Sequence, residues 1–163
     1  TSIDKDVAQE LAKFTGIRLF LYGLTSIDKD VAQELVKFNG ENLFLYGLTS
    51  IDKDVAQELA KFNGKNLFLY GLTSIDKDVA QELVKFKVGL SLYGLTSIDK
   101  DVAQELVKFK VSLHLDSLTS IDKDVAQKLG KSKVKNLQLS AKALQTYQEV
   151  NGESPSFMAG GMF

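Results

Sequence analysis

The string TSIDKDVAQEL at residues 25–35 decides the fold, because it recurs along almost the whole chain. It begins at residues 1, 25, 49, 73 and 96, and it returns at residue 119 with Lys128 in place of Glu. Successive copies therefore start 24, 24, 24, 23 and 23 residues apart. Copies this alike cannot each be a separate fold, so we expect one supersecondary unit that is stacked on itself six times.

The repeated string predicts a helix. Val31, Leu35 and Phe38 fall at i, i+4 and i+7, which places them on one apolar stripe. Asp28 is expected to cap the helix by accepting backbone N–H bonds. Gly40 is expected to end it with a positive φ, and two other copies repeat this glycine at Gly16 and Gly64.

The second half of each unit predicts a short strand. Residues 19–24 read LFLYGL, so Leu occupies every other position of an extended run. The matching runs cover residues 43–48, 67–72, 90–95 and 113–118, and a sixth begins at Leu137. One strand and one helix cannot bury both faces alone, so each strand is expected to pair in parallel with the next, with the helices behind.

The L-x-L-x-x-L pattern followed by a helix, from Thr1 to about Ala141, resembles the leucine-rich repeats, in an atypical bacterial form. The resemblance implies a right-handed α/β solenoid with a parallel sheet on the concave face and helices on the convex face. The usual Asn after the strand is missing. Leu24 and its copies stand nearest that place, so the turn is expected to be held by Thr25 and Ser26. The alternative architecture, a stack of helix pairs, is disfavoured because the leucines of the LFLYGL runs alternate with a period of two residues.

Two segments are expected: a six-unit solenoid over residues 1–140, and a C-terminal segment over 141–163. Within the C-terminal segment, the sequence predicts a capping helix over residues 141–150, followed by a flexible tail. Solenoids need caps, and Thr1 lies inside a unit. We therefore expect a piece of a longer protein, or an open end that a partner covers.

Composition excludes several classes of function. The 163 residues carry 20 Lys+Arg and 21 Asp+Glu, a net charge of -1, which argues against a nucleic-acid or anionic-membrane binder. The absence of Cys excludes disulfides, thiolate catalysis and Cys-ligated zinc. No apolar run approaches the ~18 residues of a membrane span.

The residues between the Leu positions are expected to point outward on the concave face. They form columns of equivalent side chains, because parallel neighbours lie ~4.8 Å apart. The predicted binding residues are Phe20, Phe44, Phe68, Tyr22, Tyr46, Tyr70 and Tyr93, with His114 and Asp116 at the polar end. An exposed aromatic patch of this kind marks a contact site. Two alternatives stay open: the rings only stiffen the sheet, or a second copy covers them.

No catalytic residue, metal ligand or cofactor is predicted. His114 and Asp116 could orient a base or hold a metal, but a solvated rim is the favoured interpretation, because two ligands make no competent site. Asp28, Lys29, Asp30 and Glu34 recur in every copy or nearly so. Such repetition indicates a solvated scaffold face rather than a catalytic or calcium site.

The favoured function is a non-enzymatic interaction module that binds a protein, peptide or glycan through the concave face. The resemblance implies protein recognition as the class. The alternative is a structural or self-assembling repeat protein in adhesion or a surface array, associating through uncapped ends or the aromatic face. An enzyme built on His114 and Asp116 is disfavoured. Localisation stays open, with the cell surface or secretion favoured over the cytoplasm because near-identical arrays suit display.

Overall fold

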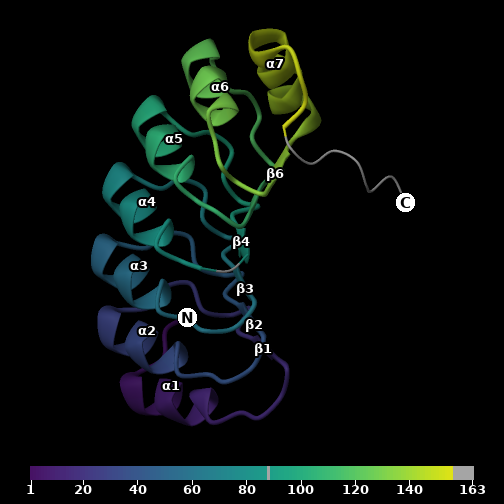
Figure 1. Ribbon diagram of the computed structural model, residues 1–163. Coiled ribbons are helices and arrows are strands. Elements are labelled where there is room, and N and C mark those ends of the chain that lie inside the picture. Colours follow the sequence, from purple (N-terminus) through teal and green to yellow (C-terminus); the bar gives the residue numbers. More distant parts are fainter. Residues whose placement is uncertain (88, 156–163) are drawn as a thin grey trace.

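The computed structural model describes residues 1–87 and 89–155. The described chain alternates short helices and strands in a curved stack of layers (Figure 1). The helices are α1 (Lys5–Ala12), α2 (Lys29–Leu35), α3 (Lys53–Leu59), α4 (Lys77–Leu83), α5 (Lys100–Leu106), α6 (Lys123–Gly130) and α7 (Ala141–Asn151). The strands are β1 (Arg18–Phe20), β2 (Asn42–Phe44), β3 (Asn66–Phe68), β4 (Gly89–Ser91), β5 (Ser112–Leu115) and β6 (Asn136–Leu139).

The strands form one parallel sheet in the order β1 to β6. Its register joins equivalent positions, so the first Leu of each strand pairs with its own copy: Leu19, Leu43, Leu67, Leu90, Leu113 and Leu137. The helices make the outer, convex layer and the strands line the inner, concave side (Figure 1). The predicted α/β solenoid with a parallel sheet is confirmed.

A single core runs between the two layers. Leu43, Leu45 and Leu48 are fully buried, and the same three positions of the next three units are at most 1% exposed. The helical stripe meets them from the other side, with Val31, Leu35 and their copies at no more than 2% exposure from α2 onward. Among the described residues, helices contact other helices only when they are neighbours in the stack, as in a one-dimensional repeat array.

The helix starts agree with the sequence. The Oδ1 atom of Asp28 accepts a hydrogen bond of 2.9 Å from the backbone N–H of Val31. The copies at Asp4, Asp52, Asp76, Asp99 and Asp122 make the same bond at 2.7–2.9 Å. These carboxylates satisfy one of the orphan donors of each first turn.

The predicted helix ends are wrong. Gly152 is the one glycine with a positive φ in the described chain, at 76°, so Gly16, Gly40 and Gly64 do not end helices in that way. Helix α2 instead ends at Leu35, and the backbone N–H of Phe38 then bonds to the carbonyl of Leu35. The Phe38 ring folds over Gly40, where a Cβ would lie 2.1 Å from its Cζ atom. This glycine is needed because a ring approaches the backbone closely.

The turns after β2, β3 and β4 also depend on glycine, at Gly47, Gly71 and Gly94. A Cβ on Gly71 would lie 2.5 Å from the carbonyl oxygens of both Tyr46 and Leu48 in the preceding turn, whereas a Cβ on Gly23 would meet nothing within 4 Å. The predicted role of Thr25 is supported, since its N–H donates to the carbonyl of Thr1 at 2.9 Å. Successive turns are therefore stacked backbone on backbone.

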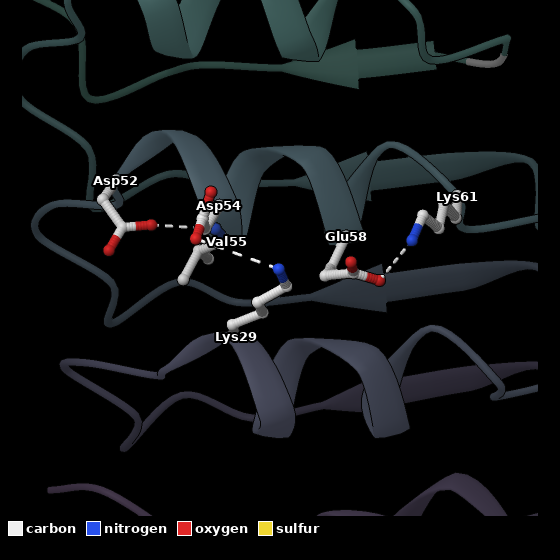
Figure 2. A network of polar contacts seen from close by, with 6 residues as sticks. All are labelled: Lys29, Asp52, Asp54, Val55, Glu58 and Lys61. Carbon is white, nitrogen blue, oxygen red and sulfur yellow. Dashed lines mark hydrogen bonds and ion pairs between the residues drawn. The ribbon is translucent and has the colours of Figure 1, made fainter.

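One charged column of the helices is buried, contrary to the prediction of a solvated face. The residues Glu34, Glu58, Glu82 and Glu105 are only 4–6% exposed. Each accepts a hydrogen bond from the Lys three residues later, and the pair Glu58–Lys61 is 2.6 Å long (Figure 2). The Lys108 ammonium holds the pKa of Glu105 below its usual value, against the opposing effect of burial, and Gln81 helps by donating a further hydrogen bond.

The charges at the helix starts are exposed and pair between units. Lys29 lies 3.9 Å from Asp54 of the next helix (Figure 2), Lys53 lies 3.8 Å from Asp78, and Lys100 lies 3.0 Å from Asp124. For these residues the predicted solvated face is correct. Each of these Asp side chains has a Lys partner from the preceding helix.

The buried column gives a matched test. Substitution Glu105→Ala removes a buried carboxylate that accepts hydrogen bonds from the exposed Lys108 and the half-buried Gln81. Since hydrogen bonds to a charged group are among the stronger ones, we expect a loss of about 1–3 kcal/mol in the free energy of unfolding at neutral pH. Glu10→Ala, at the exposed copy, should change it by less than about 0.5 kcal/mol. Urea unfolding followed by circular dichroism measures both. Equal effects of the two variants would contradict the burial argument.

The same pair predicts a pH dependence. The pKa of Glu105 is lowered by folding, so its stabilisation is complete above the ordinary value of 4.5 and is lost as the pH falls through the folded value. The stability difference between the wild type and Glu105→Ala should therefore shrink as the pH falls below 4.5. A difference as large at about pH 3 as at about pH 7 would show that the ion pair does not carry it.

The stacked turns predict a second contrast. Gly71→Ala must push the turn away from two carbonyl oxygens, so we expect it to destabilise the fold by about 1–3 kcal/mol. Gly23→Ala should be nearly neutral, because the space beside it is open. The fifth unit carries Ser117 at this place, so a shifted turn rather than unfolding is the expected response. Thermal melts of the two variants measure this difference in stability. A Gly71→Ala variant as stable as the wild type would contradict the close-approach argument.

Candidate functional site

The concave side of the sheet carries all nine residues that the sequence predicts as a binding site. The Phe column occupies the third position of β1, β2 and β3, and the register continues it through Ser91 to His114. The Tyr column lies two residues further on, in the turns that follow the strands. Adjacent rings contact each other within and between these columns. We call the seven rings the aromatic ladder: Phe20, Phe44, Phe68, Tyr22, Tyr46, Tyr70 and Tyr93.

The rings of the ladder stack face to face along the sheet. Phe44 lies 4.2 Å from Phe20 and 4.2 Å from Phe68 between ring centroids, with planes 16° and 3° apart. Tyr46 and Tyr70 stack at 4.3 Å and 11°. The outer tyrosine pairs, Tyr22–Tyr46 and Tyr70–Tyr93, are tilted instead, at 55° and 52°. Phe44 is stacked on both faces, so it presents its edge to the concave solvent. This geometry follows from strand spacing, which sets the distance between identical side chains.

Stacking makes the ladder less exposed than seven separate rings would be. Phe44 is buried at 8% exposure, and Tyr46, Phe68 and Tyr70 are half-buried. The exposed members are at the two ends, with Tyr22 at 58% and Tyr93 at 36%. The columns of equivalent residues in the sequence show which rings are adjacent. They do not show how much of the solvent-exposed area of a ring is covered by its neighbour. The inner rings therefore contribute mainly packing between units, whereas the end rings offer exposed surface.

The tyrosine hydroxyls stay protonated at neutral pH. Burial, followed by the neighbouring Tyr46 and Tyr93, raises the pKa of Tyr70 to about 12. Burial also raises the pKa of Tyr46 and of Tyr93, and the Asp116 carboxylate adds to the shift at Tyr93. The concave face therefore offers a row of neutral hydroxyl groups, each able to donate and accept hydrogen bonds.

The polar end of the site is a His–Asp pair beside Tyr93. The Nδ1 atom of His114 lies 3.9 Å from Oδ2 of Asp116, and both side chains are about a quarter exposed. That Asp116 oxygen has no hydrogen-bond partner in the described chain. The described residues contain no group of three or more His, Cys, Asp or Glu that could hold a metal ion. That oxygen is buried, so the pair offers the remaining, quarter-exposed part of its two side chains at the margin of the ladder.

The sequence analysis missed a second ladder inside the core. Phe14, Phe38, Phe62 and Phe86 follow the helices and stack at centroid distances of 6.2–6.4 Å. A Phe recurring once per unit after the VAQEL string is the signal that could have found it. This ladder is buried from Phe38 onward, whereas Phe14 is half exposed at the outer face of the first unit.

Comparisons with known proteins add little beyond the fold. No family model and no curated protein sequence matches the chain. A solved structure of a leucine-rich-repeat protein from Leptospira interrogans is similar over 95% of this chain and 51% of that protein, with 19% identity and a TM-score of 0.41. This chain spans about half the length of that protein. In the described part, no helix combines the length and apolarity that crossing a membrane requires.

The chain's own geometry decides the fold type. Its units repeat every 23–24 residues, and each pairs an L-x-L strand with a helix. Equivalent leucines from every unit line one core, and the strands form a parallel sheet on the concave side (Figure 1). The usual Asn after the strand is replaced by a glycine turn stacked on its predecessor. The chain therefore has the fold of an α/β solenoid of the leucine-rich-repeat type, with strand–helix layers around one leucine core.

Proposed function

We propose that the chain is a non-enzymatic interaction module that binds an extended protein or peptide segment across the concave face. The observation that carries this proposal is the aromatic ladder, which runs across four consecutive units at the open side of the sheet. Concave sheets of this kind offer one continuous surface to a partner. Exposed aromatic side chains supply rigid contact area at little cost in side-chain entropy.

The ring geometry favours a peptide over a glycan. Sugars stack on the open faces of aromatic rings, but here the inner faces are covered by neighbouring rings. Ring edges carry the positive end of the quadrupole, so they suit backbone carbonyl oxygens. The protonated hydroxyls of Tyr46 and Tyr70 add hydrogen bonds that an extended backbone can complete.

Opposite charges at the two ends of the concave surface favour one orientation of a bound segment. Arg18 is exposed in β1, and Asp116 follows β5 with one oxygen unpartnered. Four strand spacings separate them, or roughly 19 Å at ~4.8 Å each, which about six extended residues can span. The matching segment carries an acidic group near Arg18 and a basic group near Asp116.

A phage-displayed library of random dodecapeptides tests the proposed function. Peptides enriched on the wild type should lose at least roughly 30-fold in affinity for the double variant Tyr22→Ala with Tyr93→Ala, since exposed aromatic anchors dominate such contacts. The matched control is Lys29→Ala on the convex face, which should bind as the wild type does. Enrichment that is equal on the double variant would contradict the proposal.

The direction of the surface has its own test. Selection on Asp116→Asn should lose any preference for Lys or Arg that selection on the wild type shows, because the neutral amide no longer attracts a cation. His114→Ala should retain that preference. Library sequences that carry no basic preference on the wild type would refute the role given to Asp116, while leaving the aromatic contact standing.

A further inference from the structure

The loops that join α4, α5 and α6 to the strands after them concentrate positive charge. Residues 82–88, 105–111 and 128–135 carry eight Lys and two Glu, a net charge of +6 in a chain whose total is -1. The equivalent residues of the first three units, 10–17, 34–41 and 58–65, carry four Lys and four Glu and are neutral. We call the exposed lysines of the three basic segments the lysine ridge: Lys85, Lys87, Lys108, Lys110, Lys131, Lys133 and Lys135.

The fold does not require this charge. At the position after Phe14 and its equivalents, the first three units carry Thr15, Asn39 and Asn63, and the last three carry Lys87, Lys110 and Lys133. All six units share one parallel sheet, and their helices pack on one another in the same way. Lysines near a helix C-terminus interact favourably with the helix dipole, but this effect ends within the last turn. The three lysines of this column lie beyond the C-caps of α4, α5 and α6, so the dipole does not account for them.

The acidic side chains of the same segments leave the ridge positive. Glu82 and Glu105 are only 6% and 4% exposed, and each is paired with its own Lys three residues later. The ammonium groups of Lys87, Lys110 and Lys133 form no hydrogen bond or ion pair within residues 1–87 and 89–155. Cations held side by side in this way attract a ligand that carries several negative charges.

The ridge lies in layers that have a neighbour on each side. Helix α4 packs between α3 and α5, α5 packs between α4 and α6, and α6 packs between α5 and α7 (Figure 1). The exposure of the lysines is therefore a property of the loop edge of the solenoid, and it does not come from an end of the stack.

The ridge contains a hollow of about 350 Å³ between the fourth and fifth units. Its apolar lining comes from Val84, Phe86 and Val111, and four lysines of the ridge complete it: Lys85, Lys87, Lys108 and Lys110. Val84 and Val111 are half-buried, so they still offer apolar surface to a ligand. The hollow is at the small end of the range of ligand pockets, ~300–1,000 Å³, which suits a single aliphatic side chain.

This combination favours an acidic peptide over a nucleic acid. Surfaces that bind nucleic acids stack the bases on exposed aromatic rings and hold phosphates with the planar fork of Arg. The rings of Phe86 and Phe109 are buried, and the one Arg of the chain, Arg18, lies in β1. Lysines act as point charges, which carboxylates can meet from any direction.

The spacing of the ridge also suits an extended polypeptide. Neighbouring units are ~4.8 Å apart at the strands and roughly 8–10 Å apart at the helices, and the ridge lies between the two. Alternate side chains of an extended chain are roughly 7 Å apart. A segment that lies along the stack can therefore place one acidic side chain beside the lysines of each unit.

We propose that the lysine ridge binds an acidic, extended segment of a partner protein, with an aliphatic side chain of that segment in the hollow between the fourth and fifth units. The ridge shares no residue with the aromatic ladder. The proposal therefore does not depend on the proposed function, and the two can fail separately.

Fluorescence anisotropy of the full chain with a labelled synthetic peptide measures the binding. The peptide has one central leucine with four glutamates on each side, and its affinity should fall as salt is added. The triple variant Lys87→Asn, Lys110→Asn and Lys133→Asn carries the residue that the second and third units already have, so it should fold normally. It should bind the peptide at least roughly 10-fold more weakly, because three unpaired cations are lost.

The matched control removes the same charge from the starts of the helices. The triple variant Lys29→Asn, Lys53→Asn and Lys100→Asn breaks only exposed ion pairs and should bind within about twofold of the wild type. Absence of binding to the wild type, or equal losses in the two triple variants, would overturn the proposal.

The hollow is tested by a change in the peptide. Replacing the central leucine with serine keeps every side-chain carboxylate, and it should lower the affinity at least roughly threefold because less apolar area is buried. If the serine peptide binds as tightly as the leucine peptide, the ridge is a cationic surface without a seat for a side chain, and the proposal is wrong.

Two further measurements distinguish other occupants. An oligothymidylate of the same net charge should bind more weakly than the peptide, and tighter binding would contradict the proposal by identifying a nucleic acid as the better ligand. The double variant Tyr22→Ala with Tyr93→Ala should bind the peptide as the wild type does. A loss of binding in that variant would place the peptide on the concave face instead of the lysine ridge, and would contradict the proposal as well.

Discussion

Parallel pairing in constant register puts each residue beside its own copy in the next unit. For leucine and phenylalanine this is favourable, because identical apolar side chains stack into the continuous core and the two ladders. For charged side chains it brings like charges together, at a cost. Lysine side chains offset this repulsion. Glu58 pairs with Lys61 of its own unit, and Asp54 pairs with Lys29 of the preceding helix (Figure 2).

Much of this architecture can be predicted from the sequence, because local chemistry and repetition agree. Asp28 caps its helix as the sequence indicates, and Leu43 lies in the core. The predictions are wrong where contacts with the Phe ring or with a neighbouring unit determine the backbone conformation or the burial of a residue. Gly40 is required by the approach of the Phe38 ring, and Glu34 is buried by the adjacent layer. The predicted binding residues do come together, but Phe44 is hidden by its own neighbours, which no column of letters reveals.

Nearest-neighbour packing concentrates unsatisfied surface at the ends of such a stack. Helix α7 resolves one end by offering Tyr147 and Asn151 to the last repeat helix. The helix of the first unit repeats the KDVAQEL string of the inner ones, yet Val7 and Phe14 are about half exposed while their inner copies are buried. The middle of the molecule and its first unit thus differ in exposure while sharing one sequence. On the concave face the copies differ at a few positions, such as His114 and Asp116.

The tyrosine row also makes the molecule its own optical probe. The chain has no Trp and five Tyr, and all but Tyr147 stand in one column along the concave face. Neighbouring rings of that column are 4.3–5.0 Å apart, close enough to share excitation energy. Near-ultraviolet circular dichroism and intrinsic emission therefore report almost entirely on this single surface. Anything that settles there or separates the rings changes the signal of an unlabelled protein.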